Sequence, residues 1–283
     1  MPELPEVETT VRGLQKEILG LNILDVWTDL ATKDKRKIDT VANPKFFLFF
    51  KKEINKQKIS SIERRGKNIL INLTSPTTIL IHLKMTGHLF YGKNHKNKYA
   101  HAIFTLSNKH FLVFSDVRKF GKITLIQTKD LLISKHLKDL GPEPLDKKFT
   151  ITNFKLKINK KPNQKIKTVL LDQSIIVGIG NIYSDEILWQ AGIHPERKVA
   201  YIKEFEFKKM FEAMKKILKK SIKLGGDSNS DYLNIYGLPG KFQNFHRAYQ
   251  QTGKKCSKIG CSGVIMRKVV NGRSSHFCSV HQI

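Results

Sequence analysis

The chain has 283 residues, enough for two packed domains, and its 51 basic and 24 acidic residues give a formal net charge of +27. No apolar run approaches the roughly 18 residues of a membrane span, and acidic residues near the amino terminus argue against a signal peptide, so we expect a cytoplasmic protein. The charge favours a polyanionic partner such as nucleic acid, although lysine enrichment can also be compositional bias.

The first predicted element is a helix that begins near Pro5, which suits a first helical turn. Glu6 and Glu8 suit the positive end of its dipole, and Gly20 can end it. Its apolar residues recur at helical spacing, at Val7, Val11, Leu14 and Ile18. By spacing alone, this is an amphipathic helix with an acidic first turn and no chemistry.

Pro2 precedes this helix and has a chemical meaning of its own. If Met1 is removed, Pro2 carries a secondary α-amine, which titrates at roughly 7.7 to 8.0 and is therefore partly neutral and nucleophilic near pH 7. Its condensation with an aldehyde gives a cationic iminium that acidifies neighbouring C–H bonds. Glu3 lies one residue away and is available as an acid. The pattern is typical of a lyase.

Short runs rich in β-branched and aromatic residues follow the helix and predict a β-sandwich or barrel of about eight strands. The expected strands are residues 23–27, 46–50, 59–64, 69–73, 78–83, 102–106, 111–115 and 123–127.

The Gly-Pro-Glu-Pro run at 141–144 punctuates the chain, and a basic, helical half follows it. A helix over 203–223 has a continuous apolar stripe, with lysines on its other face, and ends at Gly225-Gly226. Residues 225–249 are polar and glycine-rich, which is typical of a functional or disordered loop.

A glycine-punctuated turn at 178–180 opens a further predicted helix at Asn181. Unpaired N–H groups at such a helix start, together with the Asn181 amide, can bind an anion.

Three loops of the strand-rich half contain residues that suit contact with DNA. Lys67 lies on a turn between two strands, a pattern that by itself is typical of a surface turn. Met85 follows a strand beside basic residues and can fill the gap left by an extruded base. Arg118 and Phe120 pair a cation with an aromatic wedge on a third loop.

The last thirty residues contain all three cysteines, Cys256, Cys261 and Cys278, followed by His281. Clustered cysteines in odd number argue for metal rather than disulfides. The Asn-Gly pair at 271–272, between strands expected at 264–270 and 274–277, predicts a hairpin, and its flanking thiolates and imidazole suit one tetrahedral zinc ion. His276 is a competing ligand.

The amino-terminal Met-Pro-Glu-Leu-Pro-Glu word resembles that of the formamidopyrimidine-DNA glycosylase family, and the runs at 170–173, 178–186 and 191–195 resemble its helix-two-turns-helix motif. The resemblance implies a two-domain α+β protein with an amino-terminal β-sandwich flanked by helices. It predicts a catalytic domain over 1–142, a linker over 143–153, a helix-two-turns-helix domain with a lesion-capping loop over 154–250 and a zinc-finger hairpin over 251–283.

The resemblance also implies a bifunctional DNA glycosylase and AP lyase that acts as a monomer on duplex DNA with an oxidised purine. The catalytic residues implied are Pro2, Glu3, Lys67 and Arg273. Met85, Arg118 and Phe120 would fill the vacated base stack. DNA contacts are expected from Tyr99, Arg118, Lys161, Lys167, Asn181 and His82.

Several positions depart from the family pattern. Lys119 stands in place of an arginine, and Tyr99 in place of a histidine. The Tyr-Gly-Arg word before the zinc site reads Tyr-Gln-Gln at 249–251, which predicts a different local backbone. The four zinc ligands do not form two Cys-x-x-Cys pairs.

Two alternatives remain open at this point. One is an endonuclease VIII-like enzyme for oxidised pyrimidines, against which Leu4 and the 225–249 loop argue. The other is a non-catalytic DNA-binding relative, against which the intact Pro2, Glu3, Lys67 and Arg273 argue.

Overall fold

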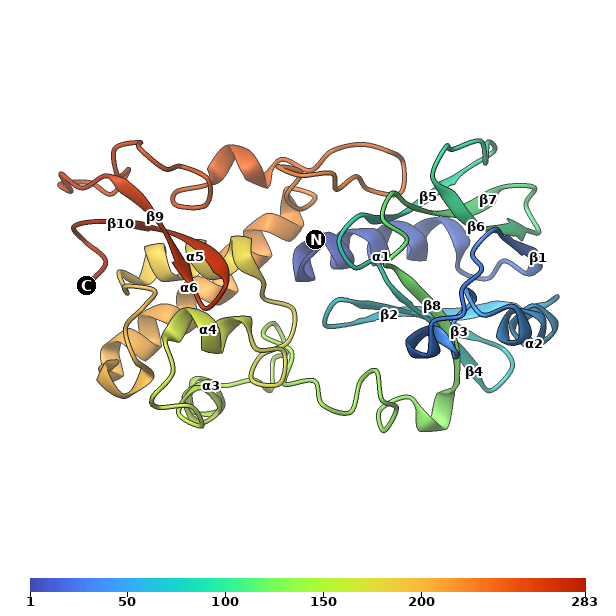
Figure 1. Ribbon diagram of the computed structural model, residues 1–283, viewed down its shortest axis with the longest axis horizontal. Helices are drawn as coiled ribbons and strands as arrows, with labels where there is room; N and C mark the ends of the chain where they lie inside the picture. Colours follow the sequence, from blue (N-terminus) through green and yellow to red (C-terminus); the bar gives the residue numbers. More distant parts are fainter. The chain divides into compact units, whose positions relative to one another are not determined.

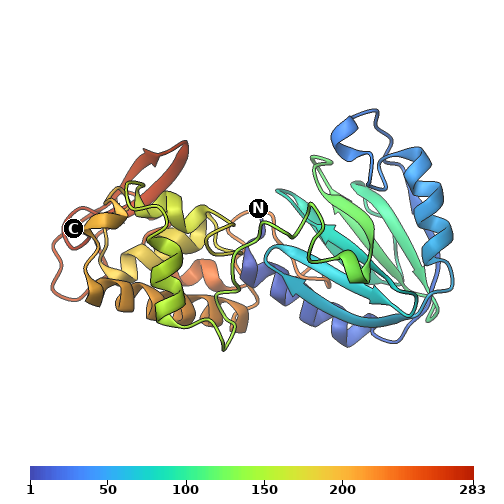
Figure 2. The ribbon, with the colours of Figure 1, turned by 90° about the horizontal axis from the view of Figure 1, so that it is seen from below.

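The first helix, α1 (Leu4–Ile18), begins where Glu3 and Glu6 form a reciprocal cap. The Glu3 carboxylate accepts the N–H of Glu6, and the Glu6 carboxylate accepts the N–H of Glu3 at 2.8 Å. The computed structural model describes residues 1–283. The predicted stripe of α1 is buried, and the helix runs beside β2 (Ile59–Arg65) in the first part of the chain (Figure 2).

Two antiparallel four-stranded sheets follow, in the orders β1-β6-β7-β5 and β2-β3-β4-β8 (Figure 1). The remaining strands are β1 (Ile23–Thr28), β3 (Asn68–Leu73), β4 (Thr77–His82), β5 (Gly87–Gly92), β6 (Ala100–Leu106), β7 (Phe111–Asp116) and β8 (Lys122–Gln127). Their inward side chains form one apolar cluster with the buried face of α1, which fits the predicted sandwich.

Two predictions about this region are wrong. Residues 46–50 are not a strand but lie in α2 (Pro44–Ile54), because Asn43 caps a helix that starts at Pro44 and buries Phe50 and Ile54 one turn apart. The strand β5 lies where a loop was expected. Gly87 permits the tight turn before it, since a Cβ there would lie 2.3 Å from the Leu83 carbonyl oxygen.

The chain divides into two units, one of Met1–Lys138 with Gly225–Gly240 and one of Asp139–Leu224 with Lys241–Ile283. The sequence-based division placed residues 225–240 with the helical domain, whereas their contacts place them with the sandwich. Ile235 explains the difference, because it is buried in the apolar cluster of the sandwich and its carbonyl accepts the Tyr91 N–H.

The second unit contains four α-helices around one apolar cluster and a terminal hairpin. These elements are α3 (Ile151–Ile158), α4 (Ile166–Leu171), α5 (Asn181–Ala191), α6 (Glu204–Lys223), β9 (Ile265–Val270) and β10 (Arg273–Cys278). The chain also has short 3₁₀ helices at Lys35–Lys37, Thr128–Asp130, Val199–Tyr201 and Phe242–Phe245. Both the 203–223 helix and the hairpin were predicted. None of the helices is long and apolar enough to span a membrane.

Candidate active site and metal centre

The amino-terminal turn places Pro2 and Glu3 in buried positions. Glu3 was expected to be available beside the amine, but its carboxylate is only 3 % exposed and accepts the Glu6 N–H as the cap of α1. Glu6 continues the chain of contacts, since its second carboxylate oxygen accepts the Asp227 N–H at 2.8 Å. Sequence reasoning assigned Glu6 only to the helix dipole and missed this link between the first turn and residues 225–240.

Lys67 lies on the two-residue turn between β2 and β3, where Gly66 has φ 57. Its side chain was expected to reach out from a surface turn, but it is 6 % exposed. His82 lies on the adjacent strand β4, opposite Asn68. Burial and the nearby ammonium groups of Lys84 and Lys67 lower the pKa of His82 to about 3, so the ring is neutral at pH 7 and its Nδ1 accepts the Lys84 N–H at 2.9 Å.

Asp116, at the end of β7, joins the two loops that carry the expected stack-filling residues. Its fully buried carboxylate accepts from the Thr86 hydroxyl at 2.5 Å, the Arg118 N–H at 3.2 Å and the Gly121 N–H at 2.7 Å. Sequence analysis did not single out Asp116. The sequence feature that could have indicated its role is an acidic residue directly before the Arg118 loop.

Met85, Arg118 and Phe120 come together as expected. The Arg118 guanidinium donates to the Met85 sulfur at 3.1 Å and lies 4.5 Å from the centre of the Phe120 ring. Met85 is 45 % exposed and Phe120 46 %, so an apolar and cationic tip faces solvent. Tyr99 lies beside this loop, because its carbonyl oxygen accepts the Asp116 N–H at 3.0 Å, and its ring is exposed.

In the second unit, Asn181 begins α5 after Gly180, where a helix start was predicted. Its Oδ1 atom is buried and accepts no hydrogen bond within the chain. Lys161, on the preceding basic stretch, is partly exposed and pairs with Asp172 at 2.5 Å. This oxygen is an acceptor and cannot itself bind an anion, so the anion site at the start of α5 stays a prediction.

The structure contradicts the expectation that Lys167 contacts DNA. Its side chain is fully buried, and its ammonium donates to Asp185 at 2.6 Å and to the Asn181 carbonyl oxygen at 3.2 Å. Asp185 also accepts from the Ser275 hydroxyl at 2.8 Å and from both the N–H and the Nδ1 of His276 at 3.0 Å. This Asp185 network, which sequence analysis did not find, joins α4 and α5 to β10.

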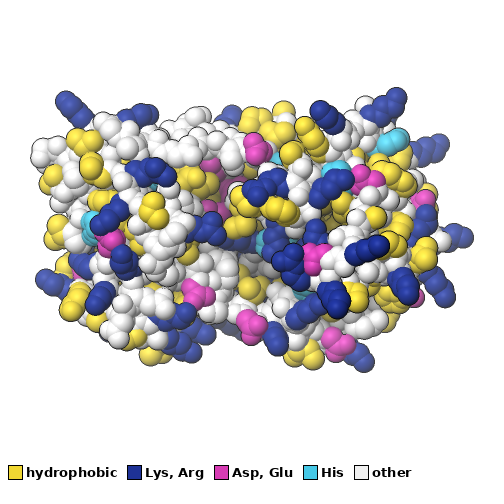
Figure 3. All heavy atoms as spheres, viewed as in Figure 1, with side chains coloured by type: hydrophobic (Ala, Val, Ile, Leu, Met, Phe, Trp, Pro, Cys, Tyr) yellow, Lys and Arg dark blue, Asp and Glu magenta, His cyan; other side chains and the backbone are white.

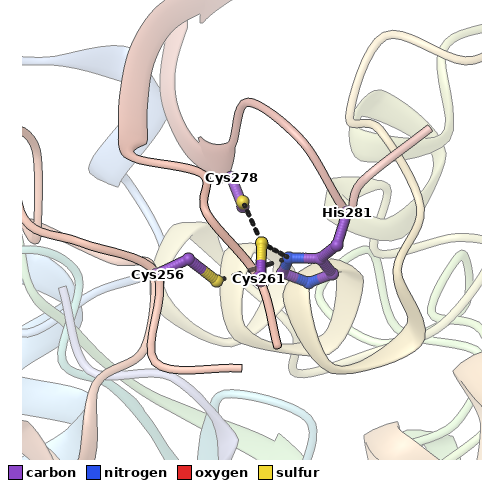
Figure 4. A group of neighbouring side chains, drawn as sticks. All are labelled: Cys256, Cys261, Cys278 and His281. Carbon is purple, nitrogen blue, oxygen red and sulfur yellow. Dashed lines mark hydrogen bonds between the residues drawn. The ribbon is translucent and has the colours of Figure 1, made fainter. Parts of the chain in front are cut away.

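Cys256, Cys261, Cys278 and His281 point toward one another, as Figure 4 shows. Their ligand atoms all lie within 4.8 Å of one another. The Cys261 and Cys278 sulfurs are 3.5 Å apart, and the Cys256 sulfur is 3.3 Å from His281 Nδ1. These separations are close to the edge of roughly 3.5 to 3.8 Å that a tetrahedral site with bonds of about 2.0 to 2.3 Å requires, so the four residues can hold a metal ion.

The surroundings of His281 orient it toward this cluster. Its Nε2 lies 3.0 Å from the Trp189 carbonyl oxygen on α5, which leaves Nδ1 facing the thiols. The competing ligand, His276, lies outside the cluster because its ring is held by Asp185. The four side chains that lie close enough to hold a metal ion are thus Cys256, Cys261, Cys278 and His281.

The segment before the cluster is held by Glu186 of α5, a buried carboxylate whose pKa is raised by burial. It accepts N–H groups of Arg247, Ala248 and Tyr249 at 2.8 to 3.1 Å. Gln250 follows with φ 55, a left-handed conformation that favours glycine. The departure at position 250 thus changes the side chain, while the backbone still takes a conformation suited to glycine.

The hairpin tip is built by Asn271 with φ 47 and Gly272 with φ 75, as the Asn-Gly pair predicts. Asn271 donates to the Thr168 hydroxyl at 2.9 Å, and Arg273 follows it with an exposed side chain. Figure 3 shows many exposed Lys and Arg side chains. The hairpin therefore presents Arg273 to solvent in a strongly basic protein.

Two family models match the chain. The formamidopyrimidine-DNA glycosylase N-terminal domain matches residues 1–123, and the formamidopyrimidine-DNA glycosylase H2TH domain matches residues 140–232. Formamidopyrimidine-DNA glycosylase from Pelotomaculum thermopropionicum is 39 % identical, over 100 % of this chain and 99 % of its own. The protein of that name from Ligilactobacillus salivarius is 38 % identical, with the same coverage.

Solved structures of the Lactococcus lactis Fpg are similar along nearly the whole chain. A complex with DNA containing an abasic site has a TM-score of 0.88 at 35 % identity, covering 99 % of both chains. A complex of the wild-type protein with DNA containing N7-benzyl-Fapy-dG has a TM-score of 0.87 at 36 % identity, with the same coverage. With both domain models and full-length relatives in agreement, this chain belongs to the formamidopyrimidine-DNA glycosylase family.

Proposed function

We propose that this protein excises oxidised purines, such as 8-oxoguanine and formamidopyrimidines, from duplex DNA and then cleaves the abasic strand by β,δ-elimination. The observation that carries the proposal is the exposed cluster of Met85, Arg118 and Phe120. An enzyme that extrudes a base must fill the gap, and inserted apolar side chains with a cation beside them suit that task.

Pro2, once Met1 is removed, attacks the sugar C1′ through its secondary amine. The N–C1′ bond forms as the bond to the base breaks, and the base leaves with a proton. Glu3, the residue after Pro2 and the cap of α1, supplies the acid at the sugar. The resulting iminium acidifies the C2′ proton, so the 3′ and then the 5′ C–O bonds break in two eliminations.

Lys67 and Arg273 complete the proposed catalytic set. Lys67 transfers a proton in the first elimination, from a buried position where its side chain has little freedom to move. Arg273 donates a proton in the second. It lies at the tip of a hairpin whose base is held by the metal centre.

The ion that we propose for Cys256, Cys261, Cys278 and His281 is zinc, because three thiolates and one imidazole match its preferred ligands. When bound, a closed four-ligand zinc site supplies folding energy and no chemistry at the sugar. The ligands come from the loop before β9 and from the end of β10, so they hold both ends of the hairpin that carries Arg273.

Phosphate contacts are proposed for Asn181, Lys161, Tyr99, Arg118 and His82. His82 would act as a neutral hydrogen-bonding group, since the pKa of its ring is about 3. With several cations on phosphates, log affinity should fall with log salt by about 0.9 for each phosphate neutralised. We also propose that the protein acts as a monomer in the cytoplasm, where cysteines stay reduced for metal binding.

Borohydride trapping tests the proposal directly. The protein should crosslink to duplexes that contain 8-oxoguanine, and the crosslink should map to Pro2. Replacing Pro2 with Gln, or retaining Met1, should abolish it, while Pro5→Ala in the same turn should keep it. A crosslink to a lysine would overturn the mechanism. Trapping on oxidised pyrimidines but not on 8-oxoguanine would overturn the substrate class.

A further inference from the structure

Residues 225–240, here called the strap (orange in Figure 1), contact α1 at several points. The Asp227 N–H donates to Glu6, and the Tyr232 hydroxyl donates to the Glu6 carbonyl oxygen at 3.0 Å. Tyr232 also lies 3.4 Å from the Thr10 hydroxyl. Farther along, Ile235 packs on Gly13, and Tyr236 donates to Glu17 at 2.6 Å.

The four α1 positions are 6, 10, 13 and 17, which is the spacing of a single helix face. Eleven residues of helix span about 16 Å. Because the strap contacts advance in the same order, from Asp227 to Tyr236, the strap runs alongside the helix rather than across it. One rigid element therefore holds the strap at several points and also begins beside Pro2.

At Gly13, the strap packs closely against α1. A glycine inside a helix costs roughly 1 kcal/mol relative to alanine, so its presence needs a reason. A Cβ at Gly13 would lie 2.9 Å from both Cγ1 and Cδ1 of Ile235. Ile235 is 1 % exposed and belongs to the apolar cluster of the sandwich, so it cannot move aside without disturbing that core.

The ends of the strap are also pinned. A Cβ on Gly240 would lie 2.2 Å from the Gly226 carbonyl oxygen, so the two ends touch backbone to backbone. Gly226 has φ 87 and lies against the Glu6 carboxylate.

We propose that the face of α1 formed by positions 6, 10, 13 and 17 is a seat that sets the strap in register with the catalytic amine, with Gly13 and Ile235 as positioning residues for base excision. This inference rests on the proposed function and on the lesion-capping loop expected from the sequence, a role that we assign to the strap. An abasic site has no base to cover, so the register should matter for base release and not for strand cleavage at a pre-formed abasic site.

The test compares Gly13→Ala, Ile235→Ala and the double variant on duplexes with 8-oxoguanine and on duplexes with a pre-formed abasic site. In the single variants, a shift of the strap by a fraction of an ångström should slow base excision by roughly tenfold or more. Cleavage at the abasic site should change by less than about twofold. In the Ile235→Ala background, Gly13→Ala should cause little further loss, because the shortened side chain leaves room for the Cβ. Lys16→Ala, on an exposed part of α1, is the matched control.

Equal loss of both activities in Gly13→Ala would mean that the seat only stabilises the sandwich and would overturn the proposal. So would unchanged base excision in both single variants. If the wild-type protein released no base at all, the proposed function would fail instead. The seat would then be judged by the melting temperatures of the four proteins: non-additive shifts would support it, and additive shifts would overturn it.

Discussion

The first turn of α1 and the terminal hairpin hold the residues proposed for catalysis by different means. The buried face of α1 belongs to the large apolar cluster of the sandwich, and this packing adds to the Glu3–Glu6 cap that holds the first turn. The buried residues of the apolar cluster under the hairpin are Trp189, Ala248, Cys256, Ile265 and Cys278, two of which belong to the proposed zinc site. Where the apolar core is this small, position depends on a few polar groups and an ion.

The largest expected effect tests this dependence at the Asp185 network. Asp185→Ala should lower the free energy of unfolding of the second unit by about 3 to 5 kcal/mol, because it leaves the Lys167 ammonium buried without its carboxylate. Thermal melts of the zinc-loaded protein measure this. The paired replacement of Lys167 by Met and Asp185 by Leu should recover much of the loss. A change below about 1 kcal/mol for Asp185→Ala would show that packing alone holds the hairpin.

Removing a metal ligand should come next. Replacing a residue that hydrogen-bonds to a metal ligand typically lowers metal affinity by roughly tenfold to hundredfold. His281→Ala removes a proposed ligand itself, so zinc affinity should fall by at least that much, and DNA affinity should fall with it. Trp189 reports the change, since its ring lies 5.3 Å from His281 and is buried. In a Trp27→Phe background, Trp189 is the remaining tryptophan. Removal of zinc by a chelator should then shift the Trp189 fluorescence emission to longer wavelength.

The control for this variant is His276→Gln, which should retain zinc because His276 lies outside the cluster. Unchanged zinc content in His281→Ala would remove the imidazole from the ligand set.

A smaller effect is expected from a variant at the hairpin tip that leaves the proposed metal site at the base of the hairpin intact. Arg273→Ala should keep zinc and the fold but lower DNA affinity or the second elimination by about tenfold, the loss expected for one charged contact. Gel analysis of the cleavage products distinguishes one elimination from two. Arg267→Ala, on the same hairpin, is the matched control. Loss of zinc in Arg273→Ala would mean that tip and base are not independent.

The smallest effect concerns the sandwich, where packing dominates and the sensitive group is His82. Its folded pKa of about 3 lies below the unfolded value, so the unfolded state binds more protons and stability falls as pH drops below about 6.5. His82→Asn keeps a side-chain acceptor for the Lys84 N–H and should remove about 1 kcal/mol of this loss between pH 6.5 and about pH 5.5. If the stability of the wild-type protein and of His82→Asn fell in parallel as the pH dropped, His82 would not be the group responsible.

Local patterns in the sequence were enough to predict several parts of this protein. The apolar spacing of α1, the Asn-Gly hairpin and the stripe of α6 all appear in the structure, because helix and strand periods and turn preferences involve only neighbouring residues. The metal cluster was predictable for a related reason, since ligand chemistry restricts which residues can share an ion. The aromatic run at 46–50 was misread because it suits a strand by composition, whereas the cap at Asn43 makes it a helix.

Only the tertiary structure decided which polar residues are exposed and which are enclosed. Lys167 looks like any other lysine of its basic stretch, and its burial follows from Asp185, which lies 18 residues away on another helix. The seat of the strap joins residues more than 200 positions apart, so no local pattern indicates why Gly13 is a glycine. Such pairings depend on how the elements pack, and the free energy that fixes them comes from contacts between distant parts of the chain.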